Sequence, residues 1–94
     1  MHTEDGPPVD PRTLVVLAGA AANRERLRFA YRSADGTETR RLTEPYRLVT
    51  AGRRWYLLAY DNDRDDWRRF RVDLRALGAR AIRAAQASTW KHPP

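Results

Sequence analysis

Apolar and polar side chains alternate with a period of two in the segment that begins at residue 26. Leu27, Phe29 and Tyr31 are apolar, and most of the residues between them and beside them are arginines. A strand places successive side chains on opposite faces, so this pattern predicts a half-buried β-strand. Ala34-Asp35-Gly36 then supplies a turn that sends the chain back beside this strand.

The strand pattern continues after this turn. Residues 37–50 are predicted to be extended, and Pro45 must lie at an edge or a bend because proline cannot donate a hydrogen bond to a sheet. Beyond the proline, the alternation predicts Tyr46 on one face and Arg47 on the other. In residues 53–60 both faces are apolar past Arg54, so we expect a central strand that is covered on both sides.

A helix is predicted before the strands, at residues 11–22. Asp10 is a good N-cap, because its carboxylate accepts hydrogen bonds from free backbone N–H groups, and Pro11 suits the first helical position. Apolar residues such as Leu17 recur at three- and four-residue spacing and form one narrow stripe. Asn23 is predicted to end the helix in a left-handed conformation.

The C-terminal part of the chain completes the predicted fold. After a polar hairpin loop at 61–66, residues 67–73 return as another strand. The pattern of 74–87 fits either a helix or a helical turn at 73–77 followed by a strand near 79–86. Short strands joined by hairpins, without parallel crossovers, predict a mainly β fold: a small antiparallel β-barrel with an N-terminal α-helix across it.

The length of the chain limits its organisation. Its 94 residues are the size of one small domain. Residues 1–9 contain glycine and prolines and are predicted to be a flexible leader, with the domain at 10–93. We expect no membrane partner, because no apolar run approaches about 18 residues. The acidic N-terminus does not resemble a secretory signal, and the absence of cysteine favours the cytoplasm.

The residue types that catalysis and metal binding require are scarce. Cysteine is absent, and the two histidines, His2 and His92, lie at the ends of the chain. A thiolate nucleophile is therefore excluded, and a histidine base or metal cluster is improbable. Asp61, Asp63 and Asp65 resemble the start of a calcium loop, but the glycine that such a loop needs is missing. We expect no enzymatic activity, no metal and no cofactor.

The chain is strongly basic. Eighteen basic residues against 12 acidic ones give a net charge of +6, and all the basic residues but Lys91 are arginine. Guanidinium groups bind phosphate through two parallel hydrogen bonds and stack on bases, so this charge favours an anionic partner such as nucleic acid. A GC-rich genome also produces a composition rich in alanine and arginine, without selection for ligand binding. Composition alone leaves both interpretations open.

Three motifs point to a family. They are Arg41-Leu42-Thr43-Glu44-Pro45-Tyr46-Arg47-Leu48, then Arg54-Trp55-Tyr56-Leu57, then Phe70-Arg71-Val72-Asp73. In this order and spacing they resemble the WYL domain family, and the resemblance covers roughly residues 10–93. It implies an Sm-like, SH3-type β-barrel with an N-terminal helix. It also implies the ligand-sensing part of a bacterial transcriptional regulator, which usually follows a winged helix-turn-helix and binds single-stranded nucleic acid or a related anionic effector.

The resemblance further implies which arginines bind the ligand. Arg41 matches the arginine ahead of the family's proline turn, and Arg71 matches its ligand-facing basic position. The family commonly has an arginine directly after Asp73, where this chain has Leu74, so Arg75 is the candidate for that contact. The hypothesis requires Arg41 and Arg71 to converge in one concave spot, with neither held by an internal carboxylate.

Aromatic residues of the motifs have two candidate roles. Tyr31 and Tyr46 match aromatic positions of the family, and a tyrosine there can either pack or stack on a base. Trp55, Tyr56 and Leu57, the tripeptide that names the family, are expected to be structural. Trp55 and Leu57 belong in the core, because buried strand aromatics dominate packing.

Two classes of function follow from these residues. The first is a non-enzymatic sensing module that binds single-stranded nucleic acid or a nucleotide-like anion and acts with a helix-turn-helix protein or domain. The second is an assembly module, whose edge strands and basic surface pair with another protein or a second copy of the chain.

Overall fold

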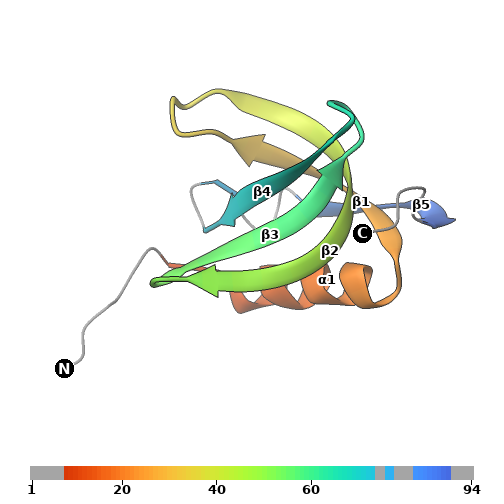
Figure 1. The fold of residues 1–94 in the computed structure, drawn as a ribbon, viewed down its shortest axis with the longest axis horizontal. Coiled ribbons are helices and arrows are strands. Elements are labelled where there is room, and N and C mark those ends of the chain that lie inside the picture. Colours follow the sequence, from red (N-terminus) through yellow and green to blue (C-terminus); the bar gives the residue numbers. More distant parts are fainter. Residues whose placement is uncertain (1–7, 74–75, 78–81, 90–94) are drawn as a thin grey trace.

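The computed structural model describes residues 8–73 and 76–77 and the backbone of 82–89. These residues form one helix and five strands, shown in Figure 1. The elements are α1 (Pro11–Ala22), β1 (Glu25–Arg32), β2 (Glu38–Ala51), β3 (Arg54–Asp61), β4 (Asp66–Val72) and β5 (Ile82–Thr89). No helix in this described part of the chain is long and apolar enough to cross a membrane.

The helix begins where the sequence predicts. The side chain of Asp10 accepts a hydrogen bond from the backbone N–H of Arg12 at 2.9 Å, and Pro11 occupies the first turn. Leu17 is fully buried and Leu14 packs against the core, as the stripe predicts. Ala18 and Ala22, which the same spacing places on the stripe, are exposed, and Thr13 and Ala20 are buried in their place. The predicted end is wrong in one detail: Asn23 has a φ of −93°, and Arg24 takes the left-handed conformation with a φ of 54°.

The strands form a single antiparallel sheet in the order β4-β3-β2-β1-β5. All four strands predicted between residues 26 and 73 are present, and the C-terminal segment adds a fifth, at Ile82–Thr89. This result favours the second interpretation of the tail, a strand rather than a continuous helix. Residues 1–7, most of the predicted leader, lie outside the described residues.

The predicted barrel is wrong, because the sheet stays open. In the part of the chain that the structure describes, β4 and β5 are edge strands at opposite ends of the strand order. Across the opening, β1 and β4 meet through side chains: the Tyr31 and Phe70 rings lie 5.0 Å apart, edge to face. The Tyr31 hydroxyl accepts the backbone N–H of Arg71 at 3.1 Å. The Tyr31 side chain thus satisfies a backbone donor at the edge of β4, where closure of a barrel would require a neighbouring strand.

A β-bulge bends the long strand β2. Pro45 pairs with Ala59 and Arg47 with Leu58, so Tyr46 is an extra residue between them. A bulge changes the direction of the side chains that follow it. Tyr46 therefore lies on the same face as Arg47, and the predicted alternation of the two is wrong. Figure 1 shows β2 curving around the molecule, as the bend at Pro45 predicts.

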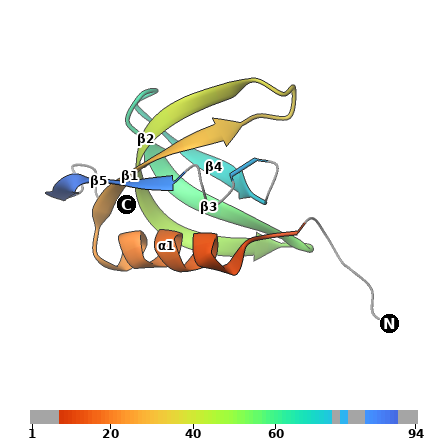
Figure 2. The ribbon, with the colours of Figure 1, turned by 180° about the vertical axis from the view of Figure 1, so that it is seen from behind.

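The core lies inside the curve of the sheet and under α1, which packs on β2 and β1 (Figure 2). Phe29 and Phe70 meet edge to face at its centre, with ring centroids 5.2 Å apart. Each such buried side chain contributes about 1.5–3 kcal/mol to stability. Leu57 and Ala59 of β3 are fully buried on this side.

The other face of the sheet, here called the outer face, carries the alternate residues of β3. Tyr56, Leu58 and Tyr60 lie there and are only half-buried. The prediction that β3 is covered on both sides is therefore wrong. Within the described residues, only neighbouring side chains of β2 and β4 shield this face, and no second layer of helix or sheet lies over it.

Candidate functional site

Arg41 lies on the core face of β2. Arg41 and Thr43 are two residues apart, so their side chains point to the same face of the strand. Thr43 pairs with Leu27 of β1 and with Asp61 of β3, and Thr43, Leu27 and Asp61 are all buried. The Arg41 side chain is 10% exposed. Its Nη1 donates to Asp61 Oδ2 at 2.5 Å, and its Nε donates to Thr39 Oγ1 at 2.9 Å. Arg41 is thus held inside the fold by a carboxylate.

Asp61 also neutralises the charge of a second arginine, Arg68. Arg68 Nη1 lies 3.7 Å from Asp61 Oδ2, and the guanidinium carbon of Arg68 is 4.9 Å from the centroid of the Phe70 ring. Asp61 is completely buried at this end of the core. Asp63 Oδ2, in the same hairpin, accepts the backbone N–H of Leu42 at 3.0 Å. Asp61 thus neutralises two arginines, and Asp63 holds the hairpin to the backbone of β2.

Arg71 lies on the opposite face from Arg41. Its neighbours on β4, Phe70 and Val72, are buried in the core, so Arg71 points to the outer face, where it pairs with Tyr56. Its Nε donates to Asp73 Oδ2 at 3.1 Å. The Arg71 side chain is 28% exposed, and its two terminal nitrogens make no further hydrogen bond within the described residues.

The structure therefore does not form the predicted spot between Arg41 and Arg71. The two arginines lie on opposite faces of the sheet, and each contacts an internal carboxylate. The two arginines differ in their access to a ligand, because Arg41 is buried whereas the Arg71 side chain is 28% exposed. Arg75, the third predicted arginine, lies outside the described residues.

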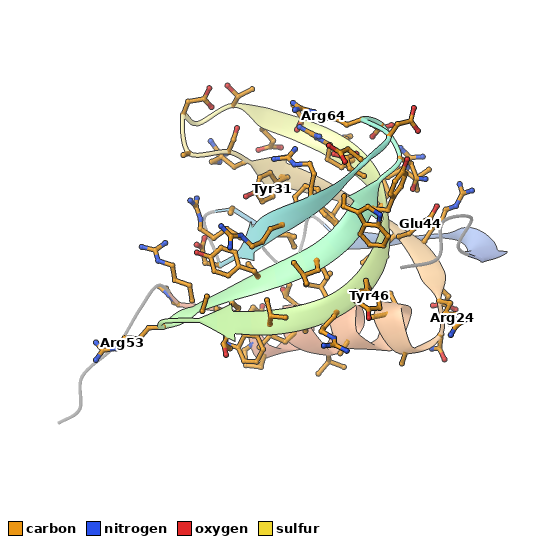
Figure 3. All side chains as sticks on the ribbon, in the orientation of Figure 1. Arg24, Tyr31, Glu44, Tyr46, Arg53 and Arg64 are labelled. Atoms are coloured by element: carbon orange, nitrogen blue, oxygen red, sulfur yellow. The ribbon has the colours of Figure 1, made fainter. Side chains whose placement is uncertain are left out.

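The predicted aromatic residues also separate. Tyr31 is 7% exposed and packs in the core, so no open ring face is available for a base. Tyr46 is half-buried on the outer face, and Figure 3 shows the two tyrosines well apart. In the WYL tripeptide, Leu57 is fully buried and Trp55 packs against the core, as expected. Tyr56 lies on the outer face, 4.7 Å from the guanidinium carbon of Arg69.

An open depression on the outer face brings other residues together. It has a volume of about 380 Å³ and is called here the outer hollow. Its lining residues come from β2, β3 and β4: Tyr46, Leu58, Trp67, Arg68 and Arg69. The bulge of β2 is necessary for this site, because it directs Tyr46 to the same side as Leu58 and Trp67.

Trp67 is the centre of an aromatic group in this hollow. Its ring lies 6.1 Å from that of Tyr46 and 5.6 Å from that of Tyr60, at interplanar angles of 79° and 82°. Trp67 is 41% exposed. Sequence reasoning missed Trp67, Tyr60 and Arg69 as a group. The signal was present in the hairpin, where Trp67 and Arg69 share one face of β4 and pair with residues of β3.

Charge is distributed unevenly around the outer hollow. Arg69 lines one end, with Arg71 two residues further along the same strand face, and Arg47 lies over the Tyr46 ring at 5.3 Å. At the other end is Tyr60, where burial raises the pKa of the hydroxyl, and nearby Asp65 and Asp66 raise it further. The hollow thus has a basic end and an acidic end.

A buried polar cluster adjoins the acidic end. Glu44 is 1% exposed and accepts a hydrogen bond from Asn62 Nδ2 at 2.8 Å. Arg26 Nε lies 3.8 Å from Glu44 Oε2. These contacts compensate the buried carboxylate and hold the hairpin against β2. Among the described residues, no group of three or more histidine and carboxylate side chains is arranged to hold a metal ion.

Comparison with known proteins gives consistent results. The family model described as "WYL domain" matches residues 12–74. The chain is 41% identical over 73 residues to the HTH-type transcriptional regulator YobV of Bacillus subtilis, covering 77% of the chain and 22% of YobV. It is 35% identical over 77 residues to the protein PafB of Mycobacterium tuberculosis, covering 81% of the chain and 23% of PafB.

A solved structure is also similar. The proteasome accessory factor B/C (PafBC) of Arthrobacter aurescens superposes with a TM-score of 0.72 at 28% identity, covering 98% of this chain and 14% of that one. The chain therefore spans under a quarter of the length of these relatives.

Proposed function

This chain belongs to the WYL domain family, and on that premise we propose that it is the regulatory sensing module of a bacterial transcriptional regulator. Its relatives include an HTH-type transcriptional regulator, in which the matched segment is a small part of the whole. We infer a non-enzymatic role in the cytoplasm, in which ligand binding to this domain is communicated to a helix-turn-helix protein or domain.

We propose that the ligand is single-stranded nucleic acid or a nucleotide-like anion, bound on the outer face. The supporting observation is the basic character of this face. Arginines of four strands lie on it: Arg28 and Arg32 of β1, Arg40 and Arg47 of β2, Arg54 of β3, and Arg69 and Arg71 of β4. Arginines spaced across a sheet surface neutralise successive phosphates, and the exposed aromatic side chains between them offer stacking surfaces.

The structure changes the roles proposed for individual residues. Arg71 and Tyr46 remain candidates for ligand contact, because both reach the outer face. Arg41 and Tyr31 support the site from inside, through Asp61 and through the backbone of β4. Arg75 remains a candidate from the family resemblance alone.

The test is a titration of fluorescein-labelled single-stranded DNA at two salt concentrations, followed by anisotropy. We expect binding that weakens as salt rises, with a slope that decreases by about 0.7 for each lost phosphate contact on a single strand. Arg71→Ala is expected to weaken binding and reduce this slope. Arg53→Ala is the matched control, because Arg53 is an exposed arginine of the β2–β3 hairpin, distant from Tyr46 in Figure 3. Absence of any salt-dependent binding would refute the proposed ligand class.

Exposed edges and an exposed helix face favour a second candidate, an assembly module. Strands β4 and β5 are both edges of the sheet, and edges can pair with another chain. Val15 and Val16 of α1 are exposed. Size-exclusion chromatography without ligand discriminates the two functions: a stable oligomer that does not bind oligonucleotides supports assembly, whereas a monomer that binds them supports sensing.

A further inference from the structure

We propose that the outer hollow is a stacking site for a single nucleobase, which lies on Trp67 while its phosphate faces Arg69 and Arg71. This inference rests on the proposed ligand class and names the part of the surface that recognises the base. It also goes beyond the family resemblance, which pointed to Arg71 and Tyr46 but not to Trp67 or Arg69. Two other residues that the resemblance indicated, Arg41 and Tyr31, are interior in this structure.

Trp67 is suited to stacking because its ring is exposed and already held in place. Tyr46 and Tyr60 both meet it at nearly perpendicular angles. Edge-to-face contacts of this kind stabilise the position of a ring. Within the described residues no aromatic ring stacks parallel to the indole, and Trp67 is 41% exposed.

The hollow has walls of the right chemistry for a planar ring. Leu58 provides an apolar surface between Trp67 and Tyr46. Arg69 adds a flat guanidinium, which can itself stack on a base. The volume of about 380 Å³ is at the small end of ligand sites, which span roughly 300–1,000 Å³. One nucleotide rather than several would therefore occupy the hollow.

The charges around the hollow determine the orientation of the ligand. Trp67, Arg69 and Arg71 share one face of β4, so the path from the ring toward Arg71 becomes more basic. Asp65 and Asp66 lie beyond the opposite end, near Tyr60. A phosphate would be repelled there and attracted toward Arg69 and Arg71. The base would therefore lie over Trp67 with its sugar and phosphate directed along β4.

A nucleobase can come from a single-stranded oligonucleotide or from a free nucleotide, and the experiment distinguishes these sources. Binding of a labelled twelve-nucleotide single strand is followed by anisotropy, a signal that does not depend on tryptophan. An unlabelled nucleoside monophosphate is then added as a competitor. Competition at millimolar concentrations or below identifies a free nucleotide as a sufficient ligand, whereas its absence shows that the base must be part of a strand.

Two further arms test stacking itself. A strand of the same length with abasic sugars keeps every phosphate but has no base, and we expect it to bind about 5- to 150-fold more weakly. Trp67→Ala is expected to weaken the normal strand by a similar factor and to leave the abasic strand unaffected. Trp67→Phe, which keeps an aromatic ring, is expected to retain most of the affinity. Arg53→Ala controls for the loss of one positive charge.

The outcomes separate the two proposals. Equal binding of normal and abasic strands, or full affinity in Trp67→Ala, overturns the stacking site and leaves the proposed function intact. No binding of any strand or nucleotide by the wild-type protein overturns the proposed function itself. The comparison of normal and abasic strands uses only wild-type protein, so it remains decisive if Trp67→Ala does not fold.

Discussion

Replacing Arg41 with alanine is expected to destabilise the fold rather than remove a ligand contact. Arg41 neutralises Asp61, which is completely buried and accepts hydrogen bonds from Arg41 Nη1 and from the backbone N–H of Asp63. Breaking a buried ion pair by removing one partner costs about 3–5 kcal/mol, because the remaining charge stays desolvated. Arg68, 3.7 Å from Asp61 Oδ2, compensates part of this loss, so we expect about 3 kcal/mol, the lower end of that range.

The expected loss is large enough to measure in a domain of this size. About 3 kcal/mol corresponds to a decrease in Tm of roughly 12–24 °C, because each kcal/mol shifts Tm by about 4–8 °C in domains of 60–100 residues. Urea unfolding followed by circular dichroism measures the same loss as a change in midpoint. The matched control is Arg40→Ala, since Arg40 is exposed on the outer face of the same strand and its loss should change stability by about 0.5 kcal/mol or less.

A double variant tests the physical cause. Arg41→Ala combined with Asp61→Ala removes both charges, so we expect it to be more stable than the sum of the two single variants predicts. The reasoning is refuted if Arg41→Ala unfolds like the wild-type protein and loses affinity for oligonucleotides. That result would place Arg41 at the ligand, as the family resemblance implies.

The remaining predictions concern the edge of β4, the start of α1 and one turn. Tyr31→Phe removes the hydroxyl that accepts the backbone N–H of Arg71. We expect a loss of about 1 kcal/mol in urea unfolding, because a partly buried donor is left without its partner; unchanged stability would show that water replaces the hydroxyl. The pKa of Asp10 is held below its ordinary value of 3.8 by hydrogen bonds from Arg12. The carboxylate therefore stabilises the fold above pH 3.8 and loses this effect as the pH falls through the lowered pKa. Tm measured between pH 2 and 6 should decrease less in Asp10→Asn, whose amide also caps a helix without titrating; parallel curves would contradict this assignment. Gly36→Ala should lower Tm, because a φ of +90° is strained for any residue type other than glycine, although no atom lies within 4 Å of the added Cβ. An unchanged Tm would mean that the turn relaxes.

Local signals in the sequence predicted most of the secondary structure. The cap at Asp10 and the alternation of Leu27, Phe29 and Tyr31 depend only on near neighbours, and both are correct in the structure. The error at the end of α1 is also local, because Asn23 and Arg24 can each take the left-handed position that ends a helix. The tail remained ambiguous in the sequence, since only pairing with β1 identifies residues 82–89 as a strand.

The candidate site was predictable only in its residue types. Arginines and tyrosines were expected to form it, and the outer hollow does contain both. That Tyr46 lies there depends on the bulge in β2, which reverses the alternation after Pro45, whereas Arg69 is placed there by the regular pairing of β4 with β3. A shift of one residue moves a side chain to the other face of a sheet, and nothing in the residues beside the proline specifies that shift.

By itself, the sequence determined an N-terminal helix, a set of antiparallel strands, a basic surface and membership of a family. The helix, the strands and the basic surface follow from interactions between residues close in the chain and from composition, whereas the family follows from the resemblance of three motifs. Only the tertiary structure decided that Arg41 is interior, because its partner Asp61 lies twenty positions further along the chain. It also decided that the Tyr31 hydroxyl is used inside the fold, since it accepts a backbone N–H forty residues away. The burial of a charge or a hydroxyl depends on the distant group that satisfies it, and periodicity along the chain does not contain that information.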